Sequence, residues 1–201
     1  VPDPESLSIK LSEPHFGIGG DGIILISPSD KADAQMRIFN ADGSEGKMCG
    51  NGIRCVGKYL YDNGMTDGRT TITIDTLSGV KTLELTVKDG KMQSARVDMG
   101  AAILAPREIP VDMDGENVIS APIVVDEKVY HMTCVSMGNP HCVIFQKEDV
   151  DDIDLTRIGP KFEHHPLFPE RVNTEFVNVL PDGSLKMRVW ERGSGETWAC
   201  G

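Results

Sequence analysis

The sequence is poor in positive charge. It has 20 lysines and arginines against 31 aspartates and glutamates, which gives a formal net charge of −11. Because no basic stripe offsets this excess, the composition argues against nucleic acid or an anionic membrane as a partner. Long apolar runs are also missing, since runs such as 23–26 end after a few residues, and no membrane-spanning segment is expected. No stretch has the pattern of a secretory signal peptide.

The sequence also lacks the cysteine patterns of disulfide-bonded and zinc-binding proteins. The cysteines are Cys49, Cys55, Cys134, Cys142 and Cys200, and their odd number and low density are typical of free thiols in a reducing cytoplasm. No Cys-x-x-Cys occurs, and neither His141-Cys142 nor His164-His165 has a partner pair at the spacing of zinc ligands. We therefore expect no bound metal.

The remaining composition is that of an ordinary globular protein, with 39% hydrophobic and 25% charged residues. A chain of 201 residues can bury one large core or two small ones. An internal repeat favours two. Residues 36–50 read MRIFNADGSEGKMCG, residues 187–201 read MRVWERGSGETWACG, and the two windows align without a gap.

The repeat places one Cys-Gly pair in each half of the chain. Its identical positions are Met36 and Met187, Arg37 and Arg188, Glu45 and Glu196, Cys49 and Cys200, and Gly50 and Gly201. In each window a strand that ends in an aromatic residue leads through a turn to Cys-Gly. This pattern predicts duplicated domains that face each other, with two sulfurs at a shared cleft.

The first Cys-Gly precedes a predicted helix. Apolar side chains at 53, 56, 59 and 60 have helical spacing, and Asn63-Gly64 is typical of a helix end. Cys49 is therefore expected at, or just before, the N-terminus of this helix. Alternating and apolar patterns predict strands at 23–26, 35–40, 70–76, 82–87, 93–99, 128–135, 142–145, 172–180 and 185–190.

The other segments give weaker signals. Residues 1–14 are polar with several prolines, and they predict a loop or an edge. The acidic run 149–154 predicts the start of a short helix that reaches Gly159-Pro160, because carboxylates are favoured at a helix N-terminus. Residues 162–171 are expected to be irregular, and 106–110 to connect the domains.

Two cysteines at helix N-termini predict a specific chemistry. The helix dipole and the unpaired amides stabilise a thiolate, and the same amides bind a carboxylate. With one substrate carboxylate held between two such sites, one sulfur removes a proton from the adjacent carbon while the other delivers one, which inverts a stereocentre without a cofactor. The repeat assigns this role to Cys49 and Cys200. We interpret Cys55, Cys134 and Cys142 as buried small hydrophobic residues.

Four motifs carry a resemblance to a known family. They are Phe39-Asn-Ala-Asp-Gly-Ser-Glu45, Met48-Cys-Gly-Asn-Gly52, Val135-Ser-Met-Gly-Asn-Pro-His141, and Glu191-Arg-Gly-Ser-Gly-Glu-Thr197 leading to Ala199-Cys-Gly201. Over nearly its whole length the chain resembles diaminopimelate epimerase. The resemblance implies a PLP-independent, two-thiol interconversion of LL- and meso-diaminopimelate in bacterial lysine and peptidoglycan biosynthesis. It also implies a cytoplasmic enzyme with no cofactor, a small-molecule substrate, no nucleic-acid or membrane partner, and a homodimer as a possible assembly.

The resemblance further implies an α/β (α+β) fold of two pseudo-symmetric domains. Each is expected to be a curved, mostly antiparallel sheet around a central helix, over residues 1–99 and 100–201. We expect the first domain to lack its first strand. We expect the second to lack its central helix and last strands, so that the chain is truncated at both ends.

The resemblance also assigns site residues one by one. Cys49 and Cys200 match the acid–base thiols. Gly50, Asn51 and Gly201 match the residues whose amides hold the reacting carboxylate. Glu191 matches the partner of the reacting amino group.

The distal end of the substrate has its own candidates. Asn40, Asn173 and Arg192 match the residues that recognise the distal amino-acid group, and Arg192 suits this role because a guanidinium binds a carboxylate through two bonds. Asn139 matches a further substrate contact. His141, with Glu191, matches the residues that tune the pKa of the thiols; the alternative for His141 is a strand-end imidazole bonded to backbone.

Two other functions stay open. An enzyme of the proline racemase or hydroxyproline epimerase type would share the fold and the thiol chemistry. That family has Cys-Gly-His where this chain has Cys49-Gly-Asn51, and Arg192 favours a substrate with a second carboxylate. A catalytically inert binding module of the same fold is disfavoured by the presence of both thiols.

Overall fold

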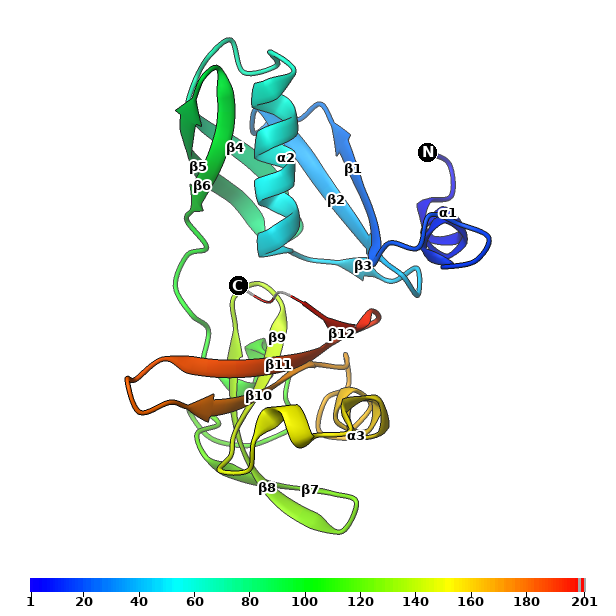
Figure 1. Ribbon diagram of the computed structural model, residues 1–201, viewed down its shortest axis with the longest axis vertical. Helices are drawn as coiled ribbons and strands as arrows, with labels where there is room; N and C mark the ends of the chain where they lie inside the picture. Colours follow the sequence, from blue (N-terminus) through cyan, green and yellow to red (C-terminus); the bar gives the residue numbers. More distant parts are fainter. Residues whose placement is uncertain (199, 201) are drawn as a thin grey trace. The chain divides into compact units, whose positions relative to one another are not determined.

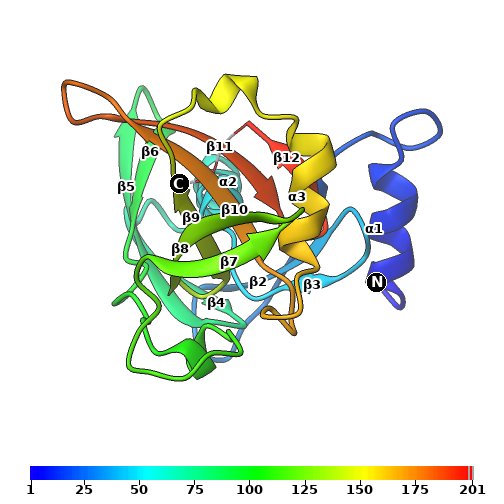
Figure 2. The ribbon, with the colours of Figure 1, turned by 90° about the horizontal axis from the view of Figure 1, so that it is seen from below.

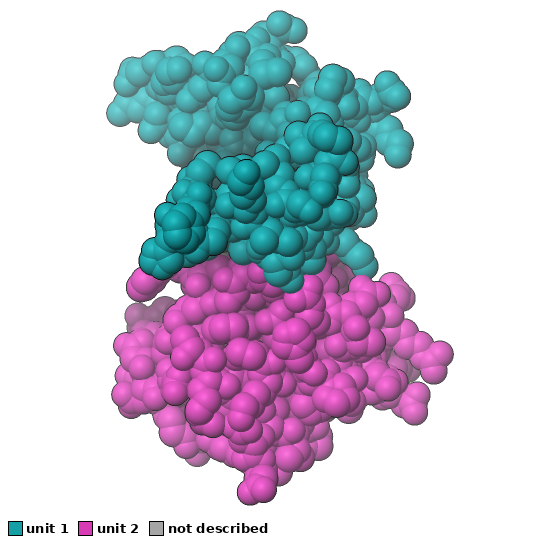
Figure 3. Space-filling view, turned by 90° about the vertical axis from the view of Figure 1, so that its right-hand side faces the viewer, with its two compact units in different colours: residues 1–100, 201 teal, residues 101–200 magenta. Residues whose placement is uncertain are grey.

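The computed structural model describes residues 1–198 and residue 200. The chain divides into two compact units, residues 1–100 and residues 101–200, which Figure 3 shows in separate colours. This boundary falls one residue after the domain boundary expected from the sequence. Each unit has its own sheet and its own hydrophobic core, and each is described by itself.

The described part of unit 1 holds a six-stranded sheet and two α-helices. Its elements are α1 (Pro4–Ser12), β1 (Gly22–Ser27), β2 (Ala34–Asn40), β3 (Glu45–Gly46), α2 (Gly50–Asp62), β4 (Thr71–Thr76), β5 (Gly79–Lys88) and β6 (Lys91–Val97). The strand order is β1-β2-β4-β5-β6, with β3 paired to β2. Among these pairs β2 and β4 are parallel and the others are antiparallel.

Helix α2 lies against the sheet of unit 1, as Figure 1 shows. It forms because Ile53, Val56 and Leu60 share one side, and this side is buried in the core of the unit. The helix ends as predicted, at its cap Asn63. Cys55 lies outside the apolar stripe and is exposed, so its interpretation as a buried residue is wrong.

The N-terminal segment is a helix, α1, and not the predicted loop or edge. The carboxylate of Asp3 caps it by accepting a hydrogen bond from the N–H of Ser6 at 3.0 Å, and Pro4 occupies the first position. The buried hydroxyl of Ser8 lies 3.0 Å from the carbonyl oxygen of Phe39 and 2.7 Å from that of Asn40. Helix α1 is therefore fixed to the end of β2, next to a predicted substrate-binding residue.

The described part of unit 2 holds a second six-stranded sheet and the helix α3. Its elements are η1 (Pro106–Glu108), β7 (Ala121–Val125), β8 (Lys128–Ser136), β9 (Pro140–Phe145), η2 (Val150–Asp152), α3 (Leu155–Glu163), β10 (Asn173–Val179), β11 (Leu185–Glu191) and β12 (Gly195–Thr197). The order is β12-β11-β10-β9-β8-β7; β9 and β10 are parallel and the other described pairs are antiparallel. Helix α3 packs on β10, β11 and β12 (Figures 1 and 2).

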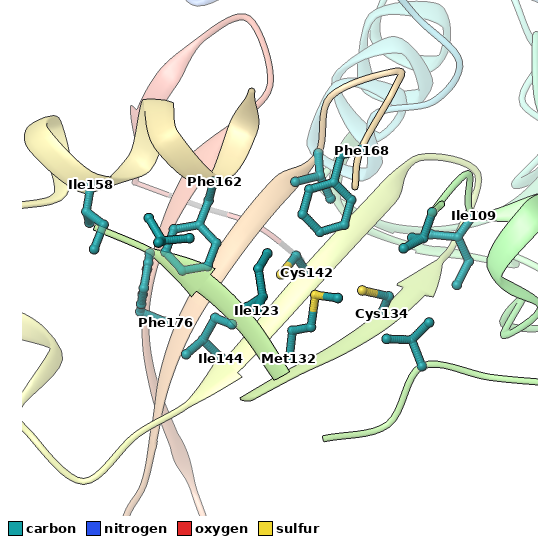
Figure 4. Close-up of a cluster of buried hydrophobic side chains, with 14 of the residues drawn as sticks. Ile109, Ile123, Met132, Cys134, Cys142, Ile144, Ile158, Phe162, Phe168 and Phe176 are labelled. Carbon is teal, nitrogen blue, oxygen red and sulfur yellow. The ribbon is translucent and has the colours of Figure 1, made fainter. Parts of the chain in front are cut away.

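The core of unit 2 is built around Phe162 of α3. Its ring centroid lies 5.2 Å from that of Tyr130 and 5.3 Å from that of Phe176, both in edge-on contacts. Cys134 and Cys142, partners across β8 and β9, are buried in the same core, as predicted (Figure 4). The neighbouring Cys134 thiol and burial raise the pKa of Cys142 well above its ordinary value.

Helix α3 begins and ends later than predicted. The acidic run supplies the cap, because the carboxylate of Asp154 accepts a hydrogen bond from the N–H of Arg157 at 3.2 Å. The helix then continues through Pro160 to Glu163. Proline removes one intrahelical hydrogen bond, and the burial of the Phe162 side chain offsets that cost.

Glycine allows α3 to approach the sheet closely. A Cβ atom at Gly159 would lie 2.3 Å from the ring of Trp190 on β11. Any larger residue at this position would therefore push the helix away from the strand that leads to the second Cys-Gly.

The internal repeat has the same strand pairing in both units. Strand β2 lies between its partners β1 and β3 as β11 lies between β10 and β12. Phe39 faces Glu45 in unit 1, and the equivalent Trp190 faces Glu196 in unit 2. The repeated sequence therefore encodes a repeated arrangement of strands.

The same ion pair closes both hairpins. Arg37 binds Glu45 through Nε–Oε1 at 2.6 Å and Nη2–Oε2 at 3.0 Å. Arg188 binds Glu196 through the same atoms at 2.8 and 3.1 Å. Such a two-point contact fixes geometry, and each hairpin leads the chain towards the cysteine that follows it.

The architecture is α+β with two mostly antiparallel, curled sheets, which confirms the predicted fold class. The short strands β3 and β12 and the edge strand β7 were not predicted. None of the helices in the described part of the chain is long and apolar enough to cross a membrane.

Candidate active site

Cys49 is the N-cap of helix α2, as the helical pattern predicts. Its sulfur is half-buried and accepts a hydrogen bond from the N–H of Gly52 at 3.3 Å. An N–H directed at sulfur, together with the positive end of the helix dipole, favours the thiolate over the thiol. The surroundings of Cys49 therefore suit a base.

Glycine at position 52 allows this contact. A Cβ atom there would lie 2.7 Å from Ile24 Cδ1 and 3.3 Å from Met36 Cε. A larger residue would require the ends of the Ile24 and Met36 side chains to move, and glycine avoids this close contact in the first turn of α2.

The predicted carboxylate-binding residues of unit 1 lie beside Cys49. Gly50 and Asn51 are the first two residues of α2, where backbone N–H groups have no acceptor within the helix and attract anions. The side-chain oxygen of Asn51 accepts a hydrogen bond from Arg54 Nη2 at 2.6 Å. At the end of β2, Asn40 Nδ2 donates to Ser44 Oγ at 3.1 Å. This unit thus combines a sulfur base with an anion-binding helix end.

In unit 2, residues from three places in the sequence meet in one group, here called the histidine cluster: Asn139, His141, Glu175 and Cys200. His141 Nδ1 lies 2.6 Å from Glu175 Oε1, and its Nε2 lies 3.0 Å from Asn139 Oδ1. Cys200 Sγ donates to the same Glu175 oxygen at 3.6 Å. His141 is thus held by side chains, so the alternative of an imidazole bonded to backbone is wrong.

The cluster also has the composition of a metal site. The donor atoms of His141, Glu175 and Cys200 all lie within 4.8 Å of one another, and these are zinc-ligand types. The spacing of cysteines and histidines did not reveal the set, because it is assembled from distant segments. The 2.6 Å distance between the His141 and Glu175 atoms is that of a charge-assisted hydrogen bond. We therefore treat the group as a hydrogen-bonded acid–base cluster.

The predicted distal-group residues of unit 2 contact one another. The backbone N–H of Arg192 donates to Asn173 Oδ1 at 2.8 Å, and its Nη1 donates to the carbonyl oxygen of Glu170 at 2.9 Å. Glu191 Oε1 accepts a hydrogen bond from the hydroxyl of Thr197 at 2.5 Å. These contacts hold the turn after β11 against the start of β10.

The predicted site residues divide between the units. Cys49, Gly50, Asn51 and Asn40 belong to unit 1, and Asn139, His141, Asn173, Glu191, Arg192 and Cys200 belong to unit 2. Gly201, predicted to help hold the carboxylate, lies outside the described residues.

Two buried glutamates of unit 2 were missed from the sequence. Glu175 lies inside β10, whose other residues are buried up to Asn178. Glu163 lies in the last turn of α3, where the helix dipole disfavours a negative charge. A carboxylate in either setting needs specific partners. The available signal in the sequence was therefore a glutamate inside an apolar strand pattern or in the last turn of a helix.

Glu163 has those partners. Its Oε1 accepts hydrogen bonds from Arg171 Nη1 at 3.1 Å and from the N–H of Gly193 at 2.9 Å. Its Oε2 accepts one from Trp190 Nε1 at 2.7 Å. Glu163, which belongs to helix α3, thus ties the turn that contains Arg192 to this helix.

We expect Glu163→Ala to lower the free energy of unfolding by about 3–5 kcal/mol, because Arg171 and Trp190 lose a buried acceptor. Urea unfolding of the intact protein measures the change. The exposed Glu148→Ala is the matched control, and its expected change is within about 0.5 kcal/mol. If both variants unfold at the same urea concentration, Glu163 is not an anchor.

Sequence comparison identifies relatives of high similarity. The model of the diaminopimelate epimerase family matches residues 2–105 and 133–201. The diaminopimelate epimerase of Acetivibrio thermocellus is 57% identical over 201 residues, which cover 100% of this chain and 71% of that protein. The diaminopimelate epimerase of Methanococcus maripaludis is 53% identical over 201 residues, which cover 100% of this chain and 72% of that protein.

Solved structures resemble the chain at the level of the fold. A probable proline racemase from Agrobacterium radiobacter K84, with bound carbonate, aligns with a TM-score of 0.73 and 16% identity over 96% of this chain. A hydroxyproline epimerase from Agrobacterium vitis, with bound trans-4-hydroxy-L-proline, aligns with a TM-score of 0.70 and 17% identity over 96% of this chain. The chain spans 60% and 59% of the length of these two proteins. At such identities the likeness establishes the fold alone.

Proposed function

The chain belongs to the diaminopimelate epimerase family, and from this premise we propose that it catalyses the interconversion of LL- and meso-diaminopimelate. The proposed enzyme is an isomerase of lysine and peptidoglycan biosynthesis. Relatives of 53–57% identity that carry the name diaminopimelate epimerase support this assignment.

One observation supports the proposed chemistry most strongly. Hairpins with the same register and the same ion pair lead to Cys49 and to Cys200, and both cysteines are half-buried. The contacts of the two sulfurs differ in kind, because Cys49 accepts an N–H whereas Cys200 donates to a carboxylate. A base and an acid of the same chemical type are what an inversion at carbon requires.

In the proposed reaction one thiolate removes the α-proton of diaminopimelate while the other thiol delivers a proton to the opposite face. The reverse reaction exchanges the two roles. The N–H groups of Gly50 and Asn51, with Gly201, hold the adjacent carboxylate and so lower the energy of the carbanion. Glu191 binds the reacting ammonium group. The thiols supply both proton transfers, so the proposal needs no cofactor and no metal.

The rest of the proposed site recognises the far end of the substrate. Asn40, Asn173 and Arg192 take the distal amino-acid group, and Asn139 makes a further contact. His141 and Glu191 tune the thiols. The proposal assigns these roles to two epimerase domains, residues 1–99 and 100–201.

The proposal includes a cytoplasmic location, because Cys55, Cys134 and Cys142 are free thiols and thiols persist in a reducing compartment. A homodimer is a possible assembly, which light scattering of the intact protein would test.

The proposed activity is tested by incubating the intact protein with LL-diaminopimelate, L-proline or trans-4-hydroxy-L-proline and resolving the stereoisomers by chiral chromatography. The expected result is meso-diaminopimelate from the first substrate and no epimer from the other two. Turnover of a proline instead would assign the chain to the chemistry of its structural neighbours. No turnover of any of the three, with thiols kept reduced, would indicate an inert binding module.

A further inference from the structure

Glu175 is a buried carboxylate with uneven contacts. Its exposed fraction is 3%, and a single oxygen, Oε1, contacts both His141 Nδ1 and Cys200 Sγ. Its other oxygen, Oε2, is buried and has no hydrogen-bond partner among the described residues. Burying half of a carboxylate without a partner costs free energy, so this arrangement requires an explanation beyond packing.

Glu163 provides the comparison within the same unit. It is buried to a similar degree, yet both of its oxygens accept hydrogen bonds from Arg171, Gly193 and Trp190. This is how a carboxylate that stabilises the fold is bonded here. Glu175 differs, because its contacts are concentrated on the one oxygen that faces the predicted acid–base thiol.

The contact with Glu175 favours the protonated form of the Cys200 thiol. A thiol that donates to a carboxylate is stabilised in its neutral form, and its ionisation would place a second negative charge beside the first. A carboxylate has no hydrogen to give, so His141 Nδ1 carries the hydrogen in their contact and holds Oε1 in place.

One further titratable group faces this carboxylate from β9. The negative charge of Glu175 contributes to the raised pKa of the buried Cys142 thiol, after the contact with Cys134 and burial. Among the described residues, His141, Cys142 and Cys200 are thus titratable groups that interact with Glu175. Both thiols are disfavoured as thiolates by its charge.

The contact made by the sulfur of Cys49 favours the opposite, deprotonated form. It accepts the N–H of Gly52 at the start of helix α2, which favours the thiolate. The two thiols of the repeat therefore have unequal surroundings, although the hairpins that lead to them are alike.

We infer that Glu175 is a positioning residue: its carboxylate orients the Cys200 thiol and keeps the proton on it before turnover, so that Cys200 starts as the acid and Cys49 as the base. This inference rests on the proposed function, because it assigns starting roles within the proposed pair of thiols. When Cys200 has given its proton to the substrate carbon, its thiolate lies beside the carboxylate. The repulsion favours return of a proton from water, while Cys49 releases to water the proton that it took from carbon, and the pair is reset.

The test is the pH dependence of alkylation. The intact protein is treated with iodoacetamide across a range of pH without substrate, and peptide mass spectrometry gives the separate rates at Cys49 and Cys200. In the wild type we expect Cys49 to react at lower pH than Cys200. In Glu175→Gln, which removes the charge and keeps the size of the side chain, the Cys200 profile should move to lower pH by about one to three units. The Cys49 profile should stay in place, a separation that a general loss of structure would not produce.

Two further variants serve as controls. Glu175→Asp keeps the charge and should give a Cys200 profile closer to the wild type than Glu175→Gln does. The exposed Glu148→Gln should leave both profiles unchanged. An unchanged Cys200 profile in folded Glu175→Gln would overturn the inference. If that variant does not fold, the wild type still decides, because Cys200 reacting at the same or lower pH than Cys49 would overturn it as well.

Alkylation needs no diaminopimelate, so its outcome is separate from the test of activity. A protein that shows the expected profiles but does not epimerise diaminopimelate would refute the proposed function and retain the effect of Glu175 on Cys200. A protein that epimerises diaminopimelate with unshifted profiles would retain the function and refute the role of Glu175.

Discussion

Replacing Cys49 with alanine is expected to lower kcat/KM for diaminopimelate by roughly 10²- to 10⁴-fold in both directions, the usual contribution of a positioned acid or base. The reason is that Cys49 holds the position of a proton acceptor, at the start of α2 with an N–H directed at its sulfur. Alanine leaves no atom that can take or give a proton there. Initial rates with LL- and meso-diaminopimelate, followed by chiral chromatography, measure the change.

Cys55 provides a matched control on the same helix. Its side chain is exposed, and Cys55→Ala should leave kcat/KM within about twofold of the wild type, as surface substitutions usually have small effects. Circular dichroism of both variants checks that α2 is intact. An active Cys49→Ala protein would remove Cys49 from the proposed mechanism, whatever the result for Cys55.

Replacing Arg192 with alanine is expected to cost roughly 2–5 kcal/mol of transition-state binding, the range for removing one partner of a buried charged pair. This corresponds to a fall in kcat/KM of roughly 30-fold to several thousand-fold. The backbone of Arg192 is held by Asn173 and its guanidinium by the carbonyl oxygen of Glu170, so the side chain is oriented before any substrate binds. Arg192→Lys should recover only part of the loss, since an ammonium cannot make the two-point contact.

Arg107 serves as the control for charge. Its side chain is 89% exposed, it lies in the same unit, and it is not one of the predicted site residues, so Arg107→Ala removes one positive charge without touching them. We expect unchanged kinetics for this variant. Wild-type turnover of diaminopimelate by Arg192→Ala would show that another group recognises the distal carboxylate.

The features that could be predicted from the sequence depend on local signals. The apolar positions 53, 56 and 60 and the end signal Asn63-Gly64 placed α2, and with it Cys49. The repeat revealed that a similar strand and turn lead to each Cys-Gly pair, because these residues are close in sequence. The short second strand of each hairpin, β3 and β12, was found only in the structure. The N-terminal helix was missed although Asp3 and Pro4 are start signals, since the prolines were interpreted as evidence for a loop.

The histidine cluster could not be predicted in full, because long-range strand pairing assembles it. The parallel pairing of β9 with β10 sets Asn173 opposite His141 and brings Glu175 within reach of that ring. No spacing in the sequence encodes this register. The resemblance named His141 and Cys200 one by one, but the carboxylate that joins them was found only in the structure.

Deuterium labelling distinguishes two acid–base thiols from one. The intact protein is incubated with LL-diaminopimelate in D₂O, and product and remaining substrate are analysed by mass spectrometry while conversion is low. With two thiols, one keeps the proton that it removes and the other supplies a deuteron from solvent. We therefore expect meso-diaminopimelate with one deuterium at the inverted carbon and remaining LL-diaminopimelate with none. Deuterium entering the remaining substrate as fast as the product would mean that a single base serves both faces, and would contradict the assignment of Cys49 and Cys200 as a pair.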